Sequence, residues 1–593
     1  ASVSVVVAAP LTAATRDLVG REAFAAMTPG VHLVNISQVF AVVILFGAGT
    51  DYCLFLISRY REELHAGFRK VEALTRSVRG VGEALAASAG TVMVGMALMA
   101  TADFAKVRYA GPAIALSLGV ALVASLTLTP ALLCLLGKKA FWPRRDIRGK
   151  AEVAGARRFS TLRLGFWDWV SRKVAARPGW VWALSTAVLL PLIAIGMRVA
   201  PNYRATGELS PQTASLQGLA AIQRHFTAGE IGPVTVLLAS ETDWASPHGR
   251  LEVQELSRVF TRLPNVAEVR SLTQPMGLPI IEFLPIEDNG TFRSRFWGAI
   301  QPYLDEFCAF MDYESEARFC GKMKHAGKTP YVTRIDVVLR SDPFDAQSAE
   351  TLQRIEDCLK ADVPRHRFIE GSIQTEYFGI TANMRDLAEV TNSDRERVNV
   401  LVVAAIFVIL LVLVRKLGLA LYLLVTVLAS YYAALGGTVL AGIFWTGAPL
   451  PHVDWRVPFF LFTILVAVGE DYNILLITRA LEERRKYGAV EGMRRALSKT
   501  GGAITSCGII MAGTFATLML AGLNTMMQIG FALAFGVLID TFIVRPFLVP
   551  AFCMLFWKDK TKPAQEEDAE PAQTLKMQAA EIARIVEDLK KAA

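Results

Sequence analysis

The sequence lacks the residue clusters that metal, nucleotide and covalent chemistry require. Its 7 His are scattered and no Cys-x-x-Cys pair occurs, so we predict no metal site. The segment nearest to a phosphate-binding loop, 321–329, has five residues between its glycines, whereas a Walker A loop has four. ATP is therefore not expected as the energy source. No nucleophile triad is recognisable, and we expect neither an enzyme nor a protein with a cofactor.

Cysteine is scarce as well, with 7 residues in the whole chain. Four of them lie in apolar stretches, where we expect them to serve as packing residues. Cys308, Cys320 and Cys358 fall in a polar segment that we place outside the cytoplasm, where disulfides persist. Three is an odd number, so one thiol would stay free. Spacing and compartment together give the hypothesis of a disulfide between Cys308 and Cys320.

Apolar residues, in contrast, are abundant. Hydrophobic residues make up 53% of the chain and the mean hydropathy is +0.38, although 20% of the residues are charged. This combination predicts membrane spans that alternate with polar segments. Spans long enough to cross, or nearly cross, about 30 Å of hydrocarbon lie near 37–58, 86–102, 110–136, 180–198, 398–414, 417–444, 457–477, 502–522 and 526–556. A weaker apolar piece at 3–12 resembles the end of another helix.

The basic residues set the predicted orientation. The net charge is +8, but Lys and Arg cluster between the spans, in the loops 59–79, 138–177, 415–416 and 479–499. We interpret this pattern as the positive charge of cytoplasmic loops, and not as a nucleic-acid surface. Alternating crossings put all of these loops on one side of the membrane and the polar segment 200–396 on the other side.

The polar segment has the pattern of a folded α+β domain. A strand, a helix and a strand are predicted twice, at 234–238, 251–263 and 266–272, and again at 331–339, 346–361 and 373–378. Two such units predict a ferredoxin-like domain, interrupted by an irregular insertion at about 276–330.

An Asp-Tyr pair occurs twice, each time inside an apolar span. The sequence GTDYCLFLISRYREE at 49–63 matches GEDYNILLITRALEE at 469–483 without a gap, with an offset of 471 − 51 = 420 residues. A carboxylate at mid-membrane costs about 2.5–3.5 kcal/mol on insertion scales, so it is rarely without a function. Self-similarity of this kind indicates two related halves, and both Asp-Tyr helices run in the same direction. The sequence thus predicts a parallel repeat with a proton or ion site formed by Asp51, Tyr52, Asp471 and Tyr472.

Other polar residues in the spans are weaker candidates. Ser88 and Ser506 are placed as equivalents by a two-residue indel, and they either extend the relay or bond to their own helix backbone. Asp540 and Arg545 lie five residues apart, which is poor spacing for a pair on one α-helix, so we expect their partners on other helices. A structural role for this second pair is at least as strong a hypothesis as proton transfer.

The domain organisation follows from these elements. We predict the end of a first transmembrane repeat at 1–137, a basic cytoplasmic linker at 138–179, a transmembrane helix at 180–198, an extracytoplasmic porter domain at 199–397, a second repeat of five spans at 398–557 and a cytoplasmic tail at 558–593. Asp51 is preceded by only 50 residues, whereas the matching part of the second half is 471 − 178 = 293 residues long. The sequence is therefore expected to be N-terminally truncated.

At this level of detail the chain resembles the MMPL branch of the RND (resistance-nodulation-division) transporter superfamily. The two Asp-Tyr segments and GVLIDTFIVRPFLVPA at 536–551 carry the resemblance. It implies proton-driven export of lipids or other hydrophobic molecules across a bacterial cytoplasmic membrane. It also implies that Asp51 meets Tyr472 and that Asp471 meets Tyr52. Glu470 departs from the usual small or apolar residue and adds a second acid beside Asp471.

Several alternatives stay open. A drug efflux pump would have the same relay, whereas a sterol-sensing, Patched-like membrane protein would not transport in bulk. The Asp-Tyr pairs would then be polar contacts that contribute roughly 0.6 kcal/mol per hydrogen bond. The expected partners are protons, a hydrophobic substrate and the lipid bilayer, with a homo-oligomer or envelope accessory proteins as further hypotheses.

Overall fold

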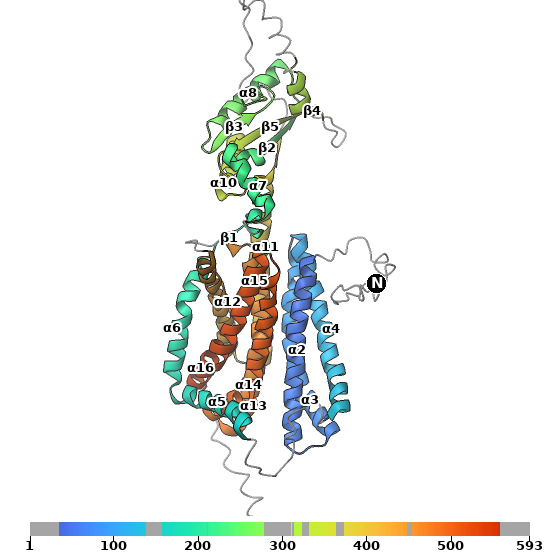
Figure 1. Cartoon of the computed structure of the whole chain (residues 1–593), viewed down its shortest axis with the longest axis vertical. Coiled ribbons are helices and arrows are strands. Elements are labelled where there is room, and N and C mark those ends of the chain that lie inside the picture. Colours follow the sequence, from blue (N-terminus) through green and yellow to red (C-terminus); the bar gives the residue numbers. More distant parts are fainter. Residues whose placement is uncertain are drawn as a thin grey trace, which may run out of the picture. The chain divides into compact units, whose positions relative to one another are not determined.

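The computed structural model describes residues 35–137, 141, 157–209, 212–277, 310, 313–322, 331–362, 373–446 and 453–557. The chain divides into two compact units (Figure 1), which are described separately below. Unit 1 comprises Ala1–Pro201 and Asp394–Ala593, and unit 2 comprises Asn202–Ser393. The apolar piece at 3–12, most of the basic linker and the tail from 558 lie outside the described residues.

Unit 1 is a bundle of long helices. Its first half contains α2 (Asn35–His65), α3 (Lys70–Ala97), η1 (Leu98–Thr101) and α4 (Ala105–Leu136), followed by α5 (Arg157–Ala176) and α6 (Pro178–Gly196). The second half contains α11 (Ile380–Val414), whose first residues belong to unit 2, α12 (Leu417–Thr446), α13 (Arg456–Tyr487), α14 (Ala489–Ala516), η6 (Thr517–Leu520), α15 (Asn524–Ile539), the π-helix η7 (Asp540–Leu548) and α16 (Val549–Phe556). Two short strands, β1 (Pro201–Asn202) and β7 (Val453–Asp454), complete the order.

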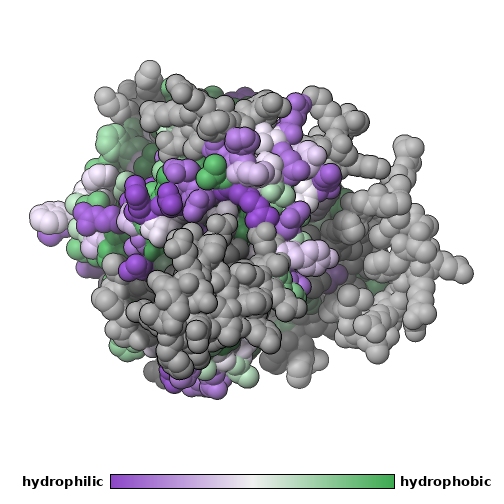
Figure 2. Space-filling view, turned by 90° about the horizontal axis from the view of Figure 1, so that it is seen from above, coloured by the Kyte–Doolittle hydropathy of each residue, from purple (hydrophilic) through white to green (hydrophobic). Residues whose placement is uncertain are grey.

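Nine helical stretches in the described ranges are long and apolar enough to cross a membrane. Each predicted span coincides with one of them, so the polytopic helical class is confirmed. Their outer surfaces expose large apolar side chains, such as Leu135 (81%), Phe444 (87%) and Leu520 (86%), as expected for lipid-facing positions. By contrast, hydrophilic residues form a band across the described part of the face seen from above (Figure 2).

The central helix of unit 1 is α13. Of its most apolar 18-residue window, 94% is buried, compared with 17% for α6. A helix that is apolar on all sides is stable when other helices surround it. Since α13 carries Glu470, Asp471 and Tyr472, these polar groups have no access to lipid and must find partners inside the bundle.

The repeat extends into the helices that follow the Asp-Tyr helices. On α3, the guanidinium of Arg76 binds Glu72 at 3.1 Å and lies 3.8 Å from the centre of an aromatic ring. On α14, Arg495 binds Glu491 at 2.8 Å and lies 3.6 Å from a ring centre. The ring near Arg76 belongs to Phe68, and the ring near Arg495 belongs to Tyr487. The offset of these two sets is 495 − 76 = 419, one residue less than for the Asp-Tyr helices.

This offset corrects the sequence alignment. The expected two-residue indel paired Ser88 with Ser506, but the structural match requires an indel of one residue, which pairs Ser88 with Cys507. The extra residue is taken up between the paired helices, where a change of length costs little because loops tolerate insertions.

Unit 2 is built around an antiparallel sheet. Its strands are β2 (Val234–Ser240), β3 (Val266–Arg270), β4 (Cys320–Lys322), β5 (Tyr331–Leu339) and β6 (Gln374–Phe378). The helices are α7 (Ala214–His225), α8 (Pro247–Thr261) and α10 (Ala346–Asp362), with short 3₁₀ turns at Ala205–Glu208 and Ala228–Ile231. The strand order is β3-β5-β2-β6, with β4 paired to β5. With α8 between β2 and β3 and α10 between β5 and β6, this is the split βαβ order of a ferredoxin-like fold.

One face of the sheet holds the core of unit 2. Burial alternates strictly along β2, as expected for a strand with one covered face. Val236 and Ile335 on neighbouring strands pack with Trp244 and with Phe260 of α8 in one apolar cluster. The indole Nε1 of Trp244 donates to the carbonyl of Tyr331 at 3.1 Å, so the polar atom of the largest core side chain is satisfied.

The proposed disulfide falls partly on residues that the structure does not describe. Cys320 on β4 has a free thiol that donates to Thr333 Oγ1 at 4.0 Å, and burial raises the pKa of this thiol. Cys308 lies outside the described residues, so its pairing with Cys320 stays a prediction.

Reporter fusions test the orientation of the helices. We expect fusions at Arg76 and Arg485 to read as cytoplasmic and a fusion at Ser246 to read as extracytoplasmic, because Lys and Arg gather in cytoplasmic loops. Alkaline phosphatase and fluorescent-protein fusions give opposite signals for the two sides. An extracytoplasmic reading at Arg485 alone would contradict the parallel arrangement of the two halves.

Candidate functional site

The first predicted contact of the two halves is present in the structure. The Tyr472 hydroxyl on α13 donates a hydrogen bond to Asp51 Oδ2 on α2. Asp51 is 4% exposed and Tyr472 is 2% exposed, so the bond is shielded from lipid and solvent. The Phe55 ring, one helical turn beyond Asp51, lies 6.0 Å from the Tyr472 ring and covers one side of the pair.

The second predicted contact is not formed. Tyr52 and Asp471 line the same small cavity as Asp51 and Tyr472, so all four side chains are brought together. However, the Tyr52 hydroxyl and Asp471 Oδ1 have no hydrogen-bond partner among the described residues. The expected symmetric exchange of Asp-Tyr contacts is therefore realised on one side only.

The serines differ in the same way. Ser88 lines the cavity beside Asp471 and is the side chain next to this carboxyl group. Ser506 donates to the Gly502 carbonyl at 2.9 Å and so bonds to its own helix. The side chain next to Asp51 is instead Cys507. Cys507 is one of the four cysteines for which the sequence predicts a packing role. The one-residue indel instead makes it the counterpart of Ser88.

Glu470 lies completely inside the bundle, with no measurable exposure. Asn473 Nδ2 donates to Glu470 Oε2 at 3.4 Å, and within the described ranges Oε1 has no partner. A buried carboxylate with only one weak donor is poorly stabilised, because burial of a charge costs free energy unless it is paired.

Asp540 and Arg545 have the expected partners on other helices, Ser430 of α12 and the Gly469 carbonyl of α13, but they also pair with each other, contrary to our expectation from their spacing. Arg545 Nη2 lies 3.4 Å from Asp540 Oδ2. The two residues belong to the π-helix η7, in which hydrogen bonds run from i to i+5, so residues five apart share a face. The rule for α-helices does not apply at this point, which explains the error.

This ion pair is connected to the Asp-Tyr helix. Arg545 Nη2 also donates to the Gly469 carbonyl at 3.3 Å, and its guanidinium lies 4.0 Å from the centre of the Tyr472 ring. Asp540 accepts a hydrogen bond from Ser430 on α12. Arg545 thus makes a cation–π contact with Tyr472, the residue that donates a hydrogen bond to Asp51.

Two glycines allow this close packing. A Cβ atom on Gly469 would lie 2.9 Å from Asp540 Oδ2, and one on Gly508 would lie 2.1 Å from Thr541 Oγ1. Both glycines therefore face η7 and let it approach α13 and α14. With the one-residue indel the first-half counterpart of Gly508 is Ala89, whereas the next residue on α3, Gly90, has open space, with nothing within 4 Å of an added Cβ atom.

Alanine substitutions test this packing. We expect Gly508→Ala to destabilise the bundle by about 1–3 kcal/mol, because the new methyl group overlaps Thr541. Gly90→Ala is the matched control and should be neutral or slightly stabilising, since alanine has the higher helix propensity. Thermal unfolding of the purified proteins in detergent gives the comparison. Equal melting temperatures for the two variants would contradict the close approach of η7 to α14.

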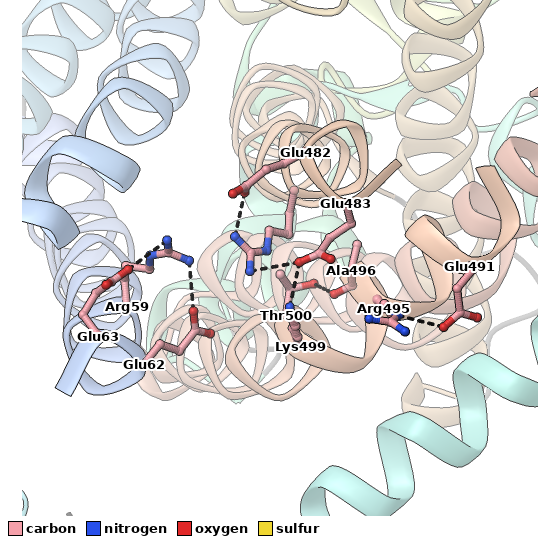
Figure 3. A network of polar contacts seen from close by, with 11 residues as sticks. Arg59, Glu62, Glu63, Glu482, Glu483, Glu491, Arg495, Ala496, Lys499 and Thr500 are labelled. Atoms are coloured by element: carbon pink, nitrogen blue, oxygen red, sulfur yellow. Dashed lines mark hydrogen bonds and ion pairs between the residues drawn. The ribbon is translucent and has the colours of Figure 1, made fainter. Parts of the chain in front are cut away.

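Next to the small cavity around the carboxyl groups lies a larger cavity of about 220 Å³, at the end of the bundle where α2 and α13 finish. Each half contributes an arginine held by the two glutamates of its Arg-x-x-Glu-Glu sequence. Arg59 binds Glu62 at 3.1 Å and Glu63 at 3.0 Å. In Figure 3, the cluster of Arg59, Glu62 and Glu63 faces the cluster that contains Glu482 and Glu483 in the second half.

In the second half, Arg479 binds Glu482 at 2.6 Å and Glu483 at 3.1 Å, and Lys499 adds a contact to Glu483 at 2.7 Å. Phe55 and Leu475 line both this cavity and the smaller one around the carboxyl groups. These two residues are equivalent in the repeat, since 475 − 55 = 420. The charged cavity and the cavity around the carboxyl groups are therefore neighbours that share two apolar side chains.

Metal binding has no support in the described part of the chain, where no group of three or more His, Cys, Asp or Glu residues could hold an ion. The chemistry that the site offers is proton binding by carboxyl groups.

Comparison with known proteins agrees with the architecture. The sequence pattern of the MMPL family matches residues 4–181 and 327–579, which include both Asp-Tyr helices and the π-helix. The chain belongs to the MMPL family, a family of multi-pass membrane transport proteins of bacteria.

Individual relatives are distant but cover most of the chain. The apo-petrobactin exporter of Bacillus anthracis is 28% identical over 88% of this chain, and the putative membrane protein ActII-3 of Streptomyces coelicolor is 29% identical over 95%. The probable transport protein MmpL12 of Mycobacterium tuberculosis is 23% identical over 89% of the chain. The chain spans 64%, 69% and 64% of the lengths of these relatives.

Proposed function

We propose that the chain is part of an exporter that uses the proton-motive force to move lipids or other hydrophobic molecules across or from the cytoplasmic membrane. The observation that carries the proposal is the small cavity in which carboxyl groups from both halves meet, with Tyr472 bonded to Asp51 and with Asp471 free of such a bond. Proton binding at this interface would bias the packing of the two halves.

The charges around the cavity support proton exchange. Asp51, Glu470, Asp471 and Asp540 are all buried, and Arg545 is the one cation that lies among them in the described ranges. Four buried negative charges against one positive charge would be very costly in a low-dielectric interior. Some of these groups must therefore hold protons, and the number of protons held depends on which side of the membrane supplies them.

The larger cavity supports a route for the protons. Its charged lining can hold water, and Phe55 and Leu475 line both this cavity and the smaller one around the carboxyl groups. With the predicted orientation, this cavity faces the cytoplasm. A proton would then leave the carboxyl groups on that side when the two apolar side chains separate.

The names of the relatives support export as the direction and leave the substrate open. One relative is named as an exporter of apo-petrobactin and another as a probable transport protein. Efflux of a small compound is therefore a second candidate, favoured by the first of these names. Both candidates use the same relay, and they differ in what unit 2 would recognise.

Carboxyl substitutions test the relay. Asp51→Asn and Asp471→Asn should each abolish export and leave folding nearly intact, because asparagine keeps the size of aspartate without its titratable charge. Loss of a charge in the membrane should if anything lower the insertion cost. Export into proteoliposomes with an imposed proton gradient gives the measurement. Wild-type export by a folded Asp471→Asn variant would leave the carboxyl groups with a structural role only.

The tyrosines and serines provide matched controls. Tyr472→Phe should reduce export roughly tenfold or more, since a hydrogen bond to a charged group contributes about 1.5–3 kcal/mol, whereas Tyr52→Phe should have a smaller effect because its hydroxyl donates to no described group. Likewise, Ser88→Ala should be more harmful than Ser506→Ala. The reverse order in either pair would contradict the asymmetry of the site.

Glu470→Gln addresses the number of titrating groups. If Asp471 alone carries the proton, this change leaves partial export with an unchanged pH profile. If Glu470 shares the proton, the two groups titrate as a coupled unit and the profile moves. The pH dependence of export between about pH 5 and 8 distinguishes the two cases.

A further inference from the structure

The helix α5 has two different faces. Its buried face is formed by Trp167, Val170 and Val174, which follow the spacing i, i+3, i+7 and join the apolar core of unit 1. The exposed face carries Phe166 and Trp169, which are 55% and 53% exposed. Large aromatic side chains on the outer face of a helix need an apolar environment, because their exposure to water is costly.

The buried face fixes α5 to α14. The Trp167 ring lies against Gly501, where a Cβ atom would come within 2.5 Å of the ring. Beside it, Arg494 on α14 donates to Asp168 at 2.7 Å, and Asp168 also binds Arg172 at 2.9 Å. These contacts hold the helix in one rotation about its axis, so the exposed aromatic face points away from the bundle.

The position of α5 along the bundle follows from the next helix. Only Arg177 separates the end of α5 from α6, a candidate membrane span that begins at Pro178. Trp180, in the first turn of α6, is 76% exposed, as is typical of an aromatic residue at a membrane surface. Figure 1 shows α5 beside the end of α6 and near α14. The helix must therefore lie at the level of the lipid headgroups.

The exposed face also carries positive charge. Lys173 and Arg177 are exposed and follow the two aromatic residues along the chain. The Phe166 and Trp169 rings stack with a centroid distance of 6.4 Å, so they form one continuous apolar patch next to these cations. Aromatic residues with adjacent cations are the composition of helices that lie in the membrane interface.

We propose that α5 is an interfacial helix that binds anionic phospholipids, with Phe166 and Trp169 inserted among the acyl chains and with Lys173 and Arg177 bound to the phosphate groups. Anionic lipids attract such cations more strongly than zwitterionic lipids do. The bound lipid would contact α5, which packs on α14. Helix α14 in turn carries Cys507, which lies next to Asp51. The site does not overlap the proton relay and does not depend on the proposed transport.

The binding is measured on the whole chain in nanodiscs that contain phosphatidylcholine and phosphatidylglycerol. Native mass spectrometry of the released protein counts the retained lipids of each kind. We expect preferential retention of phosphatidylglycerol, and a loss of apparent affinity of roughly fivefold per removed charge in the double variant Lys173→Gln, Arg177→Gln. The double variant Phe166→Ala, Trp169→Ala should lower the retention of both lipids, because insertion of the rings does not select for charge.

The matched control removes two exposed cations from unit 2, Arg224→Gln and Arg262→Gln, and should retain lipids as the wild type does. Both α5 variants leave the buried residues Trp167, Val170 and Val174 unchanged, so wild-type behaviour in size-exclusion chromatography is expected. The proposal is overturned if Lys173→Gln, Arg177→Gln retains as much phosphatidylglycerol as the wild type, or if the control loses as much. Since no transport is measured, failure of the relay hypothesis would leave this result unchanged.

Discussion

The charge balance around Arg545 is the constraint on which the centre of the bundle depends. One guanidinium lies among four buried carboxyl groups, and it contacts Asp540, the Gly469 carbonyl and the Tyr472 ring at once. An unpaired charge in this environment would be strongly destabilising. The glycines that let η7 approach, the full burial of α13 and the use of a π-helix all bring this cation within reach of its partners.

The π-helix η7 allows Asp540 and Arg545 to pair although they are five residues apart. In an α-helix, side chains five residues apart point in different directions, so Asp540 could not meet Arg545. The wider turn of η7 puts both on the face that packs against α13, where a side chain at Gly469 would block the approach. No π-helix is found in the described part of the first half, and α4 carries no buried charged residue. The two halves therefore share the Asp-Tyr helix but not the group that balances its charge.

The sequence predicted the features that depend on composition and local pattern. Carboxylates in apolar runs are conspicuous, so the sequence pointed to Asp51 and Asp471, and the strand–helix–strand pattern, found twice, predicted the sheet. The features that it did not predict depend on local backbone geometry or on a short insertion. The Asp540–Arg545 pair required a π-helix, and the role of Cys507 was hidden because motif similarity placed Ser506 opposite Ser88. The missing Tyr52–Asp471 bond had no sequence signal, since both tyrosines occur in the same motif.

If the carboxyl groups carry protons as proposed, the broken symmetry of the cavity would give the transport cycle an order. Two identical halves would load their carboxyl groups with equal probability, and the transporter could run through either sequence of states. Asp51 accepts a hydrogen bond from Tyr472 and lies next to the Cys507 thiol, whereas Asp471 lies next to the Ser88 hydroxyl, so the two carboxyl groups have chemically different surroundings. On the proposed function, the first proton to bind and the first proton to leave would then belong to different halves. A repeat with unequal sites would in this way impose a direction in time on the proposed cycle, which two equal halves could not do.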